Sequence, residues 1–412
     1  MRNKSSQLKP SKFSNYQIWT IVILAMTQFT VVLDFMVMSP LGDILKKSLD
    51  LTPSEFSFVV AAYAFSAGIS GFLTAGFADR FDRKKLLLFF YVGFILGTLL
   101  CGLVNSYTTL VLARVITGIF GGVISSISMA IIADVFLANQ RGRVIGYLQM
   151  GFGVSQVMGI PISLVLANVW GWQSPFFMIV VLAGLIWLTA LLKMKPITEH
   201  LAIQEKENPL IHLWKTIKNR KYRLGFLATA FMSLGGWMMM PWGSVYSINN
   251  LKVTEAQLPL LFLVGGVTTL IIMPIIGKMA DRYDRMGLFM FACLLMVIAV
   301  LVYCNLGIYP FWVVVVVNMV MMIGIMSRMV PANALIMALP ELHDRGSFMS
   351  INSSLQQLSG GIAASVSGVI VVQQDKNSPL DHFDILGYVV VLIIVLNILF
   401  MNRVNTVVNK SS

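Results

Sequence analysis

The sequence predicts an all-α integral membrane protein with twelve transmembrane helices. Its 412 residues are 57% hydrophobic and only 12% charged, whereas soluble domains carry about 25% charged residues. So much apolar surface needs a bilayer as its solvent. The apolar runs are also unbroken instead of alternating, which argues against an outer-membrane barrel.

Twelve runs are long enough to cross roughly 30 Å of hydrocarbon at about 1.5 Å per residue. They lie at about 17–40, 54–78, 84–104, 107–136, 143–168, 173–192, 222–247, 256–279, 287–307, 311–338, 346–372 and 384–402. The first run is too long for the apolar region of a signal peptide, so we expect it to be the first span. The three cysteines fall inside apolar runs, which argues against a disulfide framework.

One long polar stretch, Lys193 to Arg223, separates the first six runs from the last six. Within it, Pro209–Arg223 is expected to form an amphipathic helix on the membrane surface, with Leu213, Trp214 and Ile217 facing lipid. We therefore predict an N-terminal six-helix bundle at 1–192, a cytoplasmic linker at 193–221 and a C-terminal six-helix bundle at 222–412.

The distribution of basic residues predicts the orientation. With the N-terminus inside, 24 of the 30 Lys and Arg residues lie on the inner side. Four lie outside (Lys46, Lys47, Lys252, Lys376) and two lie within the membrane (Arg114, Arg328). Because inner loops are the basic ones, both termini should be cytoplasmic, in a bacterial inner membrane. The net charge of +12 is thus explained by topology and does not indicate nucleic-acid binding.

A repeat links the two halves. The loop Asp79-Arg80-Phe81-Asp82-Arg83 is echoed 202 residues later by Asp281-Arg282-Tyr283-Asp284-Arg285. Arg141-Gly142 and Arg345-Gly346 form a second echo. Basic loops alone would not reproduce the acidic positions, so we infer a duplicated six-helix unit. Two such units around a central site are expected of an alternating-access transporter.

This arrangement resembles the major facilitator superfamily, in particular its proton-coupled drug and small-metabolite efflux members. The family's loop motif, G-x-x-x-D-R-x-G-R-[RK], is matched at Asp79, Arg80, Arg83 and Lys84, although Asp82 replaces a glycine. The fourth predicted span, 107–136, resembles the family's motif with a buried arginine, which is Arg114 here. The resemblance implies a monomer that carries a small molecule with protons and needs no cofactor.

The same resemblance suggests two further groups of residues. A cytoplasmic gate would hold the halves together in the outward-open state, and its members would be Asp79, Arg80, Arg83, Asp134, Asp281, Arg282 and Arg285. Helix 5 carries a Gly/Pro-rich motif at Gly153, Gly159 and Pro161, where exporters join Gly directly to Pro. The Gly-Ile-Pro form here is closer to sugar and small-metabolite efflux members.

Three ionisable residues lie well inside the spans: Asp34, Arg114 and Arg328. Each costs at least roughly 2.5–3.5 kcal/mol to insert, so each needs a partner or a wet cavity. Asp34 and Arg114 lie at equal predicted depth, which permits a salt bridge. Our hypothesis is that Asp34 is the proton-coupling carboxylate, because separation from Arg114 would favour its protonation.

Arg328 has no acidic partner in its half. One possibility is that it bonds to backbone carbonyls near Pro331, to Asn318, or to Gln356 and Gln357 of the eleventh span. The other is that it receives an anionic group of the substrate, alone or with Arg114. The remaining predicted substrate contacts lie on the first and seventh spans: Thr27, Thr30, Asp34, Met38, Trp237, Met240 and Trp242. The Met and aromatic residues among them could equally be ordinary core residues.

The sequence contains no nucleotide-binding Gly-rich loop, no His/Cys metal cluster and no H-E-x-x-H motif. We therefore expect neither an enzyme nor a metal site. A receptor or scaffold without transport activity is disfavoured by the intramembrane charges. Proton-coupled efflux is the leading interpretation, and uptake or exchange of an anionic metabolite (a carboxylate, phosphate ester or siderophore-like anion) is the alternative.

Overall fold

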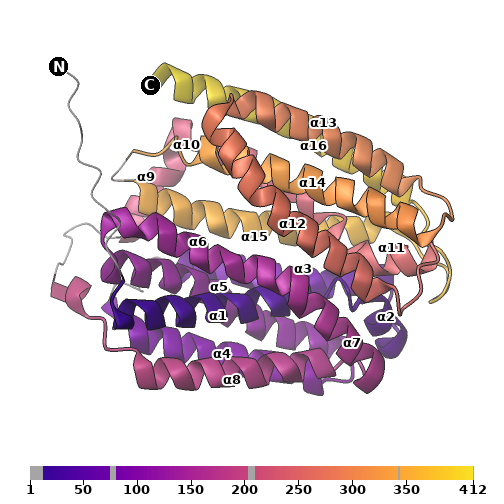
Figure 1. The fold of residues 1–412 in the computed structure, drawn as a ribbon, viewed down its shortest axis with the longest axis horizontal. Coiled ribbons are helices and arrows are strands. Elements are labelled where there is room, and N and C mark those ends of the chain that lie inside the picture. Colours follow the sequence, from indigo (N-terminus) through magenta and orange to yellow (C-terminus); the bar gives the residue numbers. More distant parts are fainter. Residues whose placement is uncertain (1–12, 75–79, 203–208, 342–343, 412) are drawn as a thin grey trace.

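The computed structural model describes residues 13–74, 80–202, 209–341 and 344–411. Nearly all of these residues are helical, and the long helices run side by side (Figure 1). The start of α1, the end of α16 and α9 lie at one end of the molecule, which we call the terminal face. The short helices α2 and α11 lie at the other end, which we call the opposite face.

The first six spans form the lower bundle in Figure 1. Its helices are α1 (Asn15–Met36), α2 (Gly42–Leu49), α3 (Pro53–Thr74), α4 (Arg83–Leu103), α5 (Tyr107–Val135), α6 (Ala138–Val154) continued by α7 (Ile160–Trp170), and α8 (Ser174–Lys193). Here α2 is a short extra helix, and α6 and α7 together make the fifth span.

The last six spans form the upper bundle. Its helices are α10 (Arg220–Trp237) continued by α11 (Gly243–Asn249), α12 (Leu258–Arg282), α13 (Arg285–Cys304), α14 (Phe311–Ile336), α15 (Arg345–Ile370) and α16 (Phe383–Ser411). Between the bundles lies α9 (Pro209–Lys218), shorter than the predicted Pro209–Arg223 helix. Its Trp214 is exposed, but Leu213 is buried against protein and does not face lipid as predicted.

Eleven spans in the described chain are long and apolar enough to cross a membrane. The twelfth, α15, is richer in Ser, Gly, Asn and Gln and falls below that hydropathy. It lies at the boundary between the bundles, packed along α3 of the other bundle and against α10 (Figure 1). Because protein covers much of it, α15 has less need of an apolar surface. The predicted twelve-helix membrane fold is confirmed.

The predicted spans agree with the helices to within a few residues, except that spans 5 and 7 are broken. A π-helical turn at Ser155–Gly159 divides α6 from α7, and a 3₁₀ turn at Met240–Trp242 divides α10 from α11. Pro161 and Pro241 lie at these breaks. Proline cannot donate the hydrogen bond that would continue the helix, which favours a break at these positions. However, α12 and α14 continue through Pro274 and Pro331, so proline alone does not decide where a span breaks.

Glycines allow helices to approach closely along the seams of the fold. A Cβ atom on Gly266 of α12 would lie 2.9 Å from the backbone of Gln156, in the other bundle. Within the N-terminal bundle, a Cβ on Gly122 of α5 would lie 2.6 Å from Cα of Ala67 in α3. Small residues at such positions let membrane helices pack backbone against backbone.

This packing predicts the effect of adding one methyl group. Gly122→Ala should push α5 away from α3 and destabilise the protein by about 1–3 kcal/mol, the usual cost of overpacking. Gly184→Ala is the matched control, because a Cβ on Gly184 of α8 would meet nothing within 4 Å. Thermal unfolding in detergent should show a lower midpoint for Gly122→Ala only, and equal midpoints for the two variants would contradict the seam.

Candidate functional site

A fully buried ion pair lies inside the N-terminal bundle. Nη1 of Arg114 in α5 donates to Oδ2 of Asp34 in α1 at 2.8 Å, and neither side chain is exposed. The hydroxyl of Thr98 in α4 donates to the other carboxylate oxygen at 3.1 Å. Both oxygens of Asp34 are therefore bonded, one by a charged donor and one by a neutral donor.

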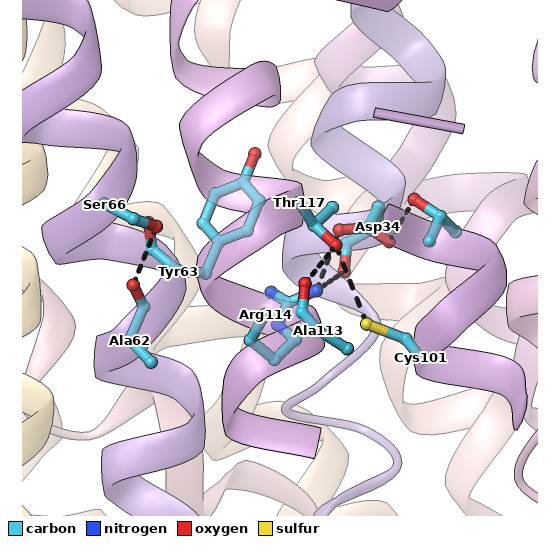
Figure 2. A network of polar contacts seen from close by, with 9 residues as sticks. Asp34, Ala62, Tyr63, Ser66, Cys101, Ala113, Arg114 and Thr117 are labelled. Carbon is cyan, nitrogen blue, oxygen red and sulfur yellow. Dashed lines mark hydrogen bonds and ion pairs between the residues drawn. The ribbon is translucent and has the colours of Figure 1, made fainter. Parts of the chain in front are cut away.

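Aromatic rings lead from this ion pair to the other bundle. Cζ of Arg114 lies 4.5 Å from the ring centroid of Tyr63 in α3, and Figure 2 shows Arg114 between Tyr63 and Asp34. Phe35 lies 5.2 Å from Tyr63 and 4.7 Å from Trp237 of α10, centroid to centroid. The ring of Trp237, a predicted substrate contact, is thus linked to the ion pair by two aromatic contacts.

Arg114 is only partly satisfied. Its Nη1 makes the ion pair and a longer bond of 3.4 Å to the Asp34 backbone carbonyl, but Nε and Nη2 have no hydrogen-bond partner among the described residues. A buried guanidinium normally has its donors bonded. The pair is held by α1, α4 and α5 together, and Gly97 helps because a Cβ there would lie 2.8 Å from Thr117 backbone.

The sequence missed three residues of this site: Tyr63, Thr98 and Phe35. Tyr63 and Thr98 stand out as polar groups within apolar runs, which was the available signal. Thr27 and Thr30 were predicted to contact substrate together with Asp34. Both are buried inside the bundle, and Thr30 shares a hydrogen bond of 2.8 Å with Tyr91 of α4. Their role in substrate binding stays a prediction.

In the C-terminal bundle, Arg328 of α14 is buried without a counter-ion. Its Nη2 donates to the carbonyl of Met232 in α10 at 3.4 Å. This partner differs from the protein groups considered from the sequence, which were the backbone near Pro331, Asn318 and the glutamines of α15. Nε and Nη1 lack a partner in the described part of the chain. Gly235 and Gly236 of α10 lie beside the guanidinium, since Cβ atoms there would come within 3.7 Å and 3.5 Å of it.

Polar contacts close the two bundles together at the opposite face. Ser244 of α11 donates to the Ser39 carbonyl at 2.6 Å, and Asn249 donates to Asp43 at 2.8 Å. Lys46 is buried and donates to Gln373. Three predicted substrate contacts belong to this closed end: Met38, Met240 and Trp242. We call these contacts the opposite-face latch.

The predicted gate residues lie at the terminal face. Arg83 of α4 binds Asp134 of α5 at 3.1 Å, which is a contact within one bundle. Arg80, Arg282 and Arg285 are exposed. Asp79 and the side chain of Asp281 lie outside the described residues, so the gate stays a prediction.

The Gly/Pro-rich motif of the fifth span, which is made of α6 and α7, lies where that span meets its neighbours. A Cβ on Gly159 would lie 2.6 Å from Leu33 of α1, and one on Gly153 would collide with Leu270 of α12 in the other bundle. Pro161 begins the first turn of α7, directly after the π-helical turn. The motif therefore combines close packing with a helix break.

Two six-helix bundles around buried intramembrane charges define a polytopic membrane transporter. The family model of the Major Facilitator Superfamily matches residues 24–364, and the chain belongs to that family. Its members carry small molecules across membranes and are not enzymes.

Individual relatives have low sequence identity to this chain but match over most of its length. An uncharacterized MFS-type transporter of Bacillus subtilis (strain 168), YbcL, is 25% identical over 354 residues, 86% of this chain and 89% of that protein. Multidrug resistance protein 2 of the same organism is 23% identical over 280 residues, 66% of this chain and 69% of that protein. A crystal structure of a D-xylose-proton symporter matches with a TM-score of 0.77 at 18% identity, covering 94% of this chain and 97% of that chain.

The latch yields a prediction about pH. Burial lowers the pKa of Lys46 from 10.5 to about 8, against the opposing effect of Asp43. The closed latch therefore disfavours the protonated lysine, while an open latch exposes it. As pH rises from about 8 towards 10.5 the closed state should gain population. Below pH 8 the ratio of closed to open protein should not change with pH.

Spin labels at Ser48→Cys and Asn377→Cys, both exposed positions, would report this closure as a distance distribution. Lys46→Met should remove the pH dependence. Lys376→Met is the control, because Lys376 is half exposed and pairs with the exposed Asp50 at 2.7 Å. A pH response that survives in Lys46→Met would rule out Lys46 as its source.

Proposed function

We propose that this protein is a proton-coupled antiporter that exports a small molecule by alternating access. The ion pair of Asp34 with Arg114 is the observation that carries the proposal. Asp34 is a carboxylate held at membrane depth by one charged and one neutral donor. Such intramembrane acids are typical proton relays in transporters.

In this mechanism the proton and the ion pair exclude one another. Deprotonated Asp34 holds Arg114 and thereby ties α1 to α5. A proton on the carboxylate removes its negative charge, so the attraction to Arg114 is lost and the two helices are free to separate. The contacts among Tyr63, Phe35 and Trp237 would pass this change to α10 of the other bundle.

The orientation follows from charge. The basic loops support a terminal face in the cytoplasm of a bacterial cell. The latched opposite face is then the external side, so the described conformation is closed outwards. Efflux is favoured by the name of the similar multidrug resistance protein 2, whereas the similar symporter is named for D-xylose and proton. We take the working unit to be a monomer.

The predicted site residues acquire distinct roles in this cycle. Trp237 contacts substrate near the ion pair, and the latch residues Met38, Met240 and Trp242 become accessible when the opposite face opens. The gate residues close the terminal face in that second state. Gly153, Gly159 and Pro161 keep span 5 packed on its neighbours while the bundles move.

The coupling role is tested by removing the charge of Asp34. In proteoliposomes with an imposed pH gradient, Asp34→Asn should lower pH-driven transport by about tenfold or more, since a proton relay is worth that much in comparable chemistry. Counterflow without a gradient should persist, because exchange needs no net proton movement. Asp50→Asn, an exposed carboxylate outside the spans, is the control.

The substrate for this assay is first chosen by screening dyes, sugars, carboxylates and siderophore-like anions. Full pH-driven transport by Asp34→Asn would end the coupling proposal. Loss of both modes with normal folding would assign Asp34 to substrate binding alone.

A second candidate function, uptake or exchange of an anionic metabolite, is favoured by Arg328. Two of its three nitrogens lack a partner although the side chain is only 3% exposed. A buried guanidinium with free donors is suited to a carboxylate or phosphate. Arg328 lies against Met232, Gly235 and Gly236 of α10, the helix that also carries Trp237. An anion bound there would lie near the helix that contacts the other bundle through Phe35.

Substitution of Arg328 separates the two functions. Arg328→Gln should reduce counterflow of carboxylates by about tenfold or more, since a lost charge-assisted bond costs about 1.5–3 kcal/mol, and should leave neutral substrates unaffected. Arg345→Gln, an exposed arginine at the start of α15, is the control. Folding is checked by size-exclusion chromatography, and unchanged anion counterflow would remove this candidate.

A further inference from the structure

A groove of about 880 Å³ opens at the terminal end of the C-terminal bundle. It is lined by α10, α15 and α16, with Ile217 of α9 at its edge. It shares no residue with the ion pair of Asp34 or with Arg328.

Three arginines line one part of the groove: Arg220, Arg223 and Arg403. Among the described residues, no acidic residue lines it. All three arginines are exposed, and within the described chain none of them makes an ion pair or lies over an aromatic ring. Within the part of the chain that the structure describes, the groove therefore gathers positive charge without a counter-ion.

The N-terminal bundle treats its basic residues differently at the same face. Arg143, Lys193 and Lys195 lie over the rings of Phe13, Trp19 and Tyr16, at 4.0, 5.6 and 5.5 Å from the centroids. These cations already have a protein partner. Other exposed basic residues at this face, such as Arg282 and Arg285, also make no ion pair with the described residues, but they do not line the groove. The groove is distinguished because three such cations meet there above an apolar wall.

Apart from Thr406, the other lining residues are apolar, and those on α10 and α15 extend from the arginines towards the middle of the spans. On α10, Arg223, Leu227 and Ala230 follow one another on the same face. Seven residues of helix place Ala230 about 10 Å further into the bilayer than Arg223. Ile351 and Leu355 of α15 form the facing wall. Charge lies at the surface and a hydrocarbon wall lies below it.

We propose that this groove binds an anionic phospholipid, with the headgroup phosphate on Arg220, Arg223 and Arg403 and an acyl chain along Leu227, Ala230 and Ile351. Basic pockets between spans at the membrane surface suit anionic headgroups, and guanidinium pairs well with phosphate oxygens. A soluble phosphate would use the arginines but leave the apolar wall uncovered.

Native mass spectrometry of the full-length protein, with phosphatidylglycerol or phosphatidylcholine added, tests this proposal. The intact protein should retain phosphatidylglycerol in preference to phosphatidylcholine. The triple variant Arg220→Gln/Arg223→Gln/Arg403→Gln should bind it about tenfold or more weakly, because each basic residue near the surface contributes to the attraction. The matched control is Lys85→Gln/Arg285→Gln/Arg345→Gln, which removes three exposed basic residues outside the groove.

Two further arms identify the source of the phosphate. Ala230→Trp should fill the apolar part and weaken lipid retention while all three arginines remain. Inorganic phosphate at millimolar concentration should not displace the lipid. Equal lipid retention by the two triple variants would overturn the proposal. Displacement by inorganic phosphate, with no effect of Ala230→Trp, would also overturn it and would indicate a soluble-anion site.

Discussion

The cost of placing charge in a membrane is the constraint on which this structure depends. Arg114 and Asp34 are both completely buried, so neither can be satisfied by water in this conformation. Removing one partner of such a pair leaves an uncompensated charge, which typically costs about 3–5 kcal/mol. The cell can neutralise Asp34 with a proton, but it cannot neutralise an arginine. Of the two partners, only Asp34 can therefore lose its charge reversibly, so the pair is opened by protonation of the carboxylate.

The two bundles differ in how they use buried arginine, although their loops carry the same motif. In the N-terminal bundle Arg114 has a carboxylate at 2.8 Å, whereas in the C-terminal bundle Arg328 has one backbone carbonyl at 3.4 Å. We infer that a duplicated six-helix unit produced the shared architecture. Among the described residues, the buried arginine has an acidic partner in the N-terminal half but not in the C-terminal half. In the proposed mechanisms, positive potential from Arg328 favours an anion between the bundles, while the exchangeable proton resides on Asp34. The asymmetry separates two electrostatic roles that one pair would otherwise have to combine.

Much of the fold follows from the sequence, and less of the site does. Hydropathy and length locate the spans because a bilayer imposes both, and Pro161 and Pro241 mark the two broken helices. Equal depth brings Asp34 and Arg114 together because helix rise is regular. Periodicity fails for Thr30, since it identifies a polar face of α1 but not the neighbour that face meets, which is Tyr91. Rotation of a helix within its bundle is decided by packing, and packing also brought Tyr63 and Thr98 to the ion pair.

Among the contacts between the bundles, two kinds differ in a way that sets the motion that the fold permits. Along α3 and α15, and along α12 and span 5, glycines bring helices into close apolar contact. These seams contain few directional bonds, so they tolerate a change of angle. The latch, in contrast, uses single hydrogen bonds such as Ser244 to Ser39 and Asn249 to Asp43. Each such bond contributes only about 0.5–1.5 kcal/mol net, and water can replace it when the face opens. Rocking about the seams with rupture of the latch is therefore the movement that costs this structure least.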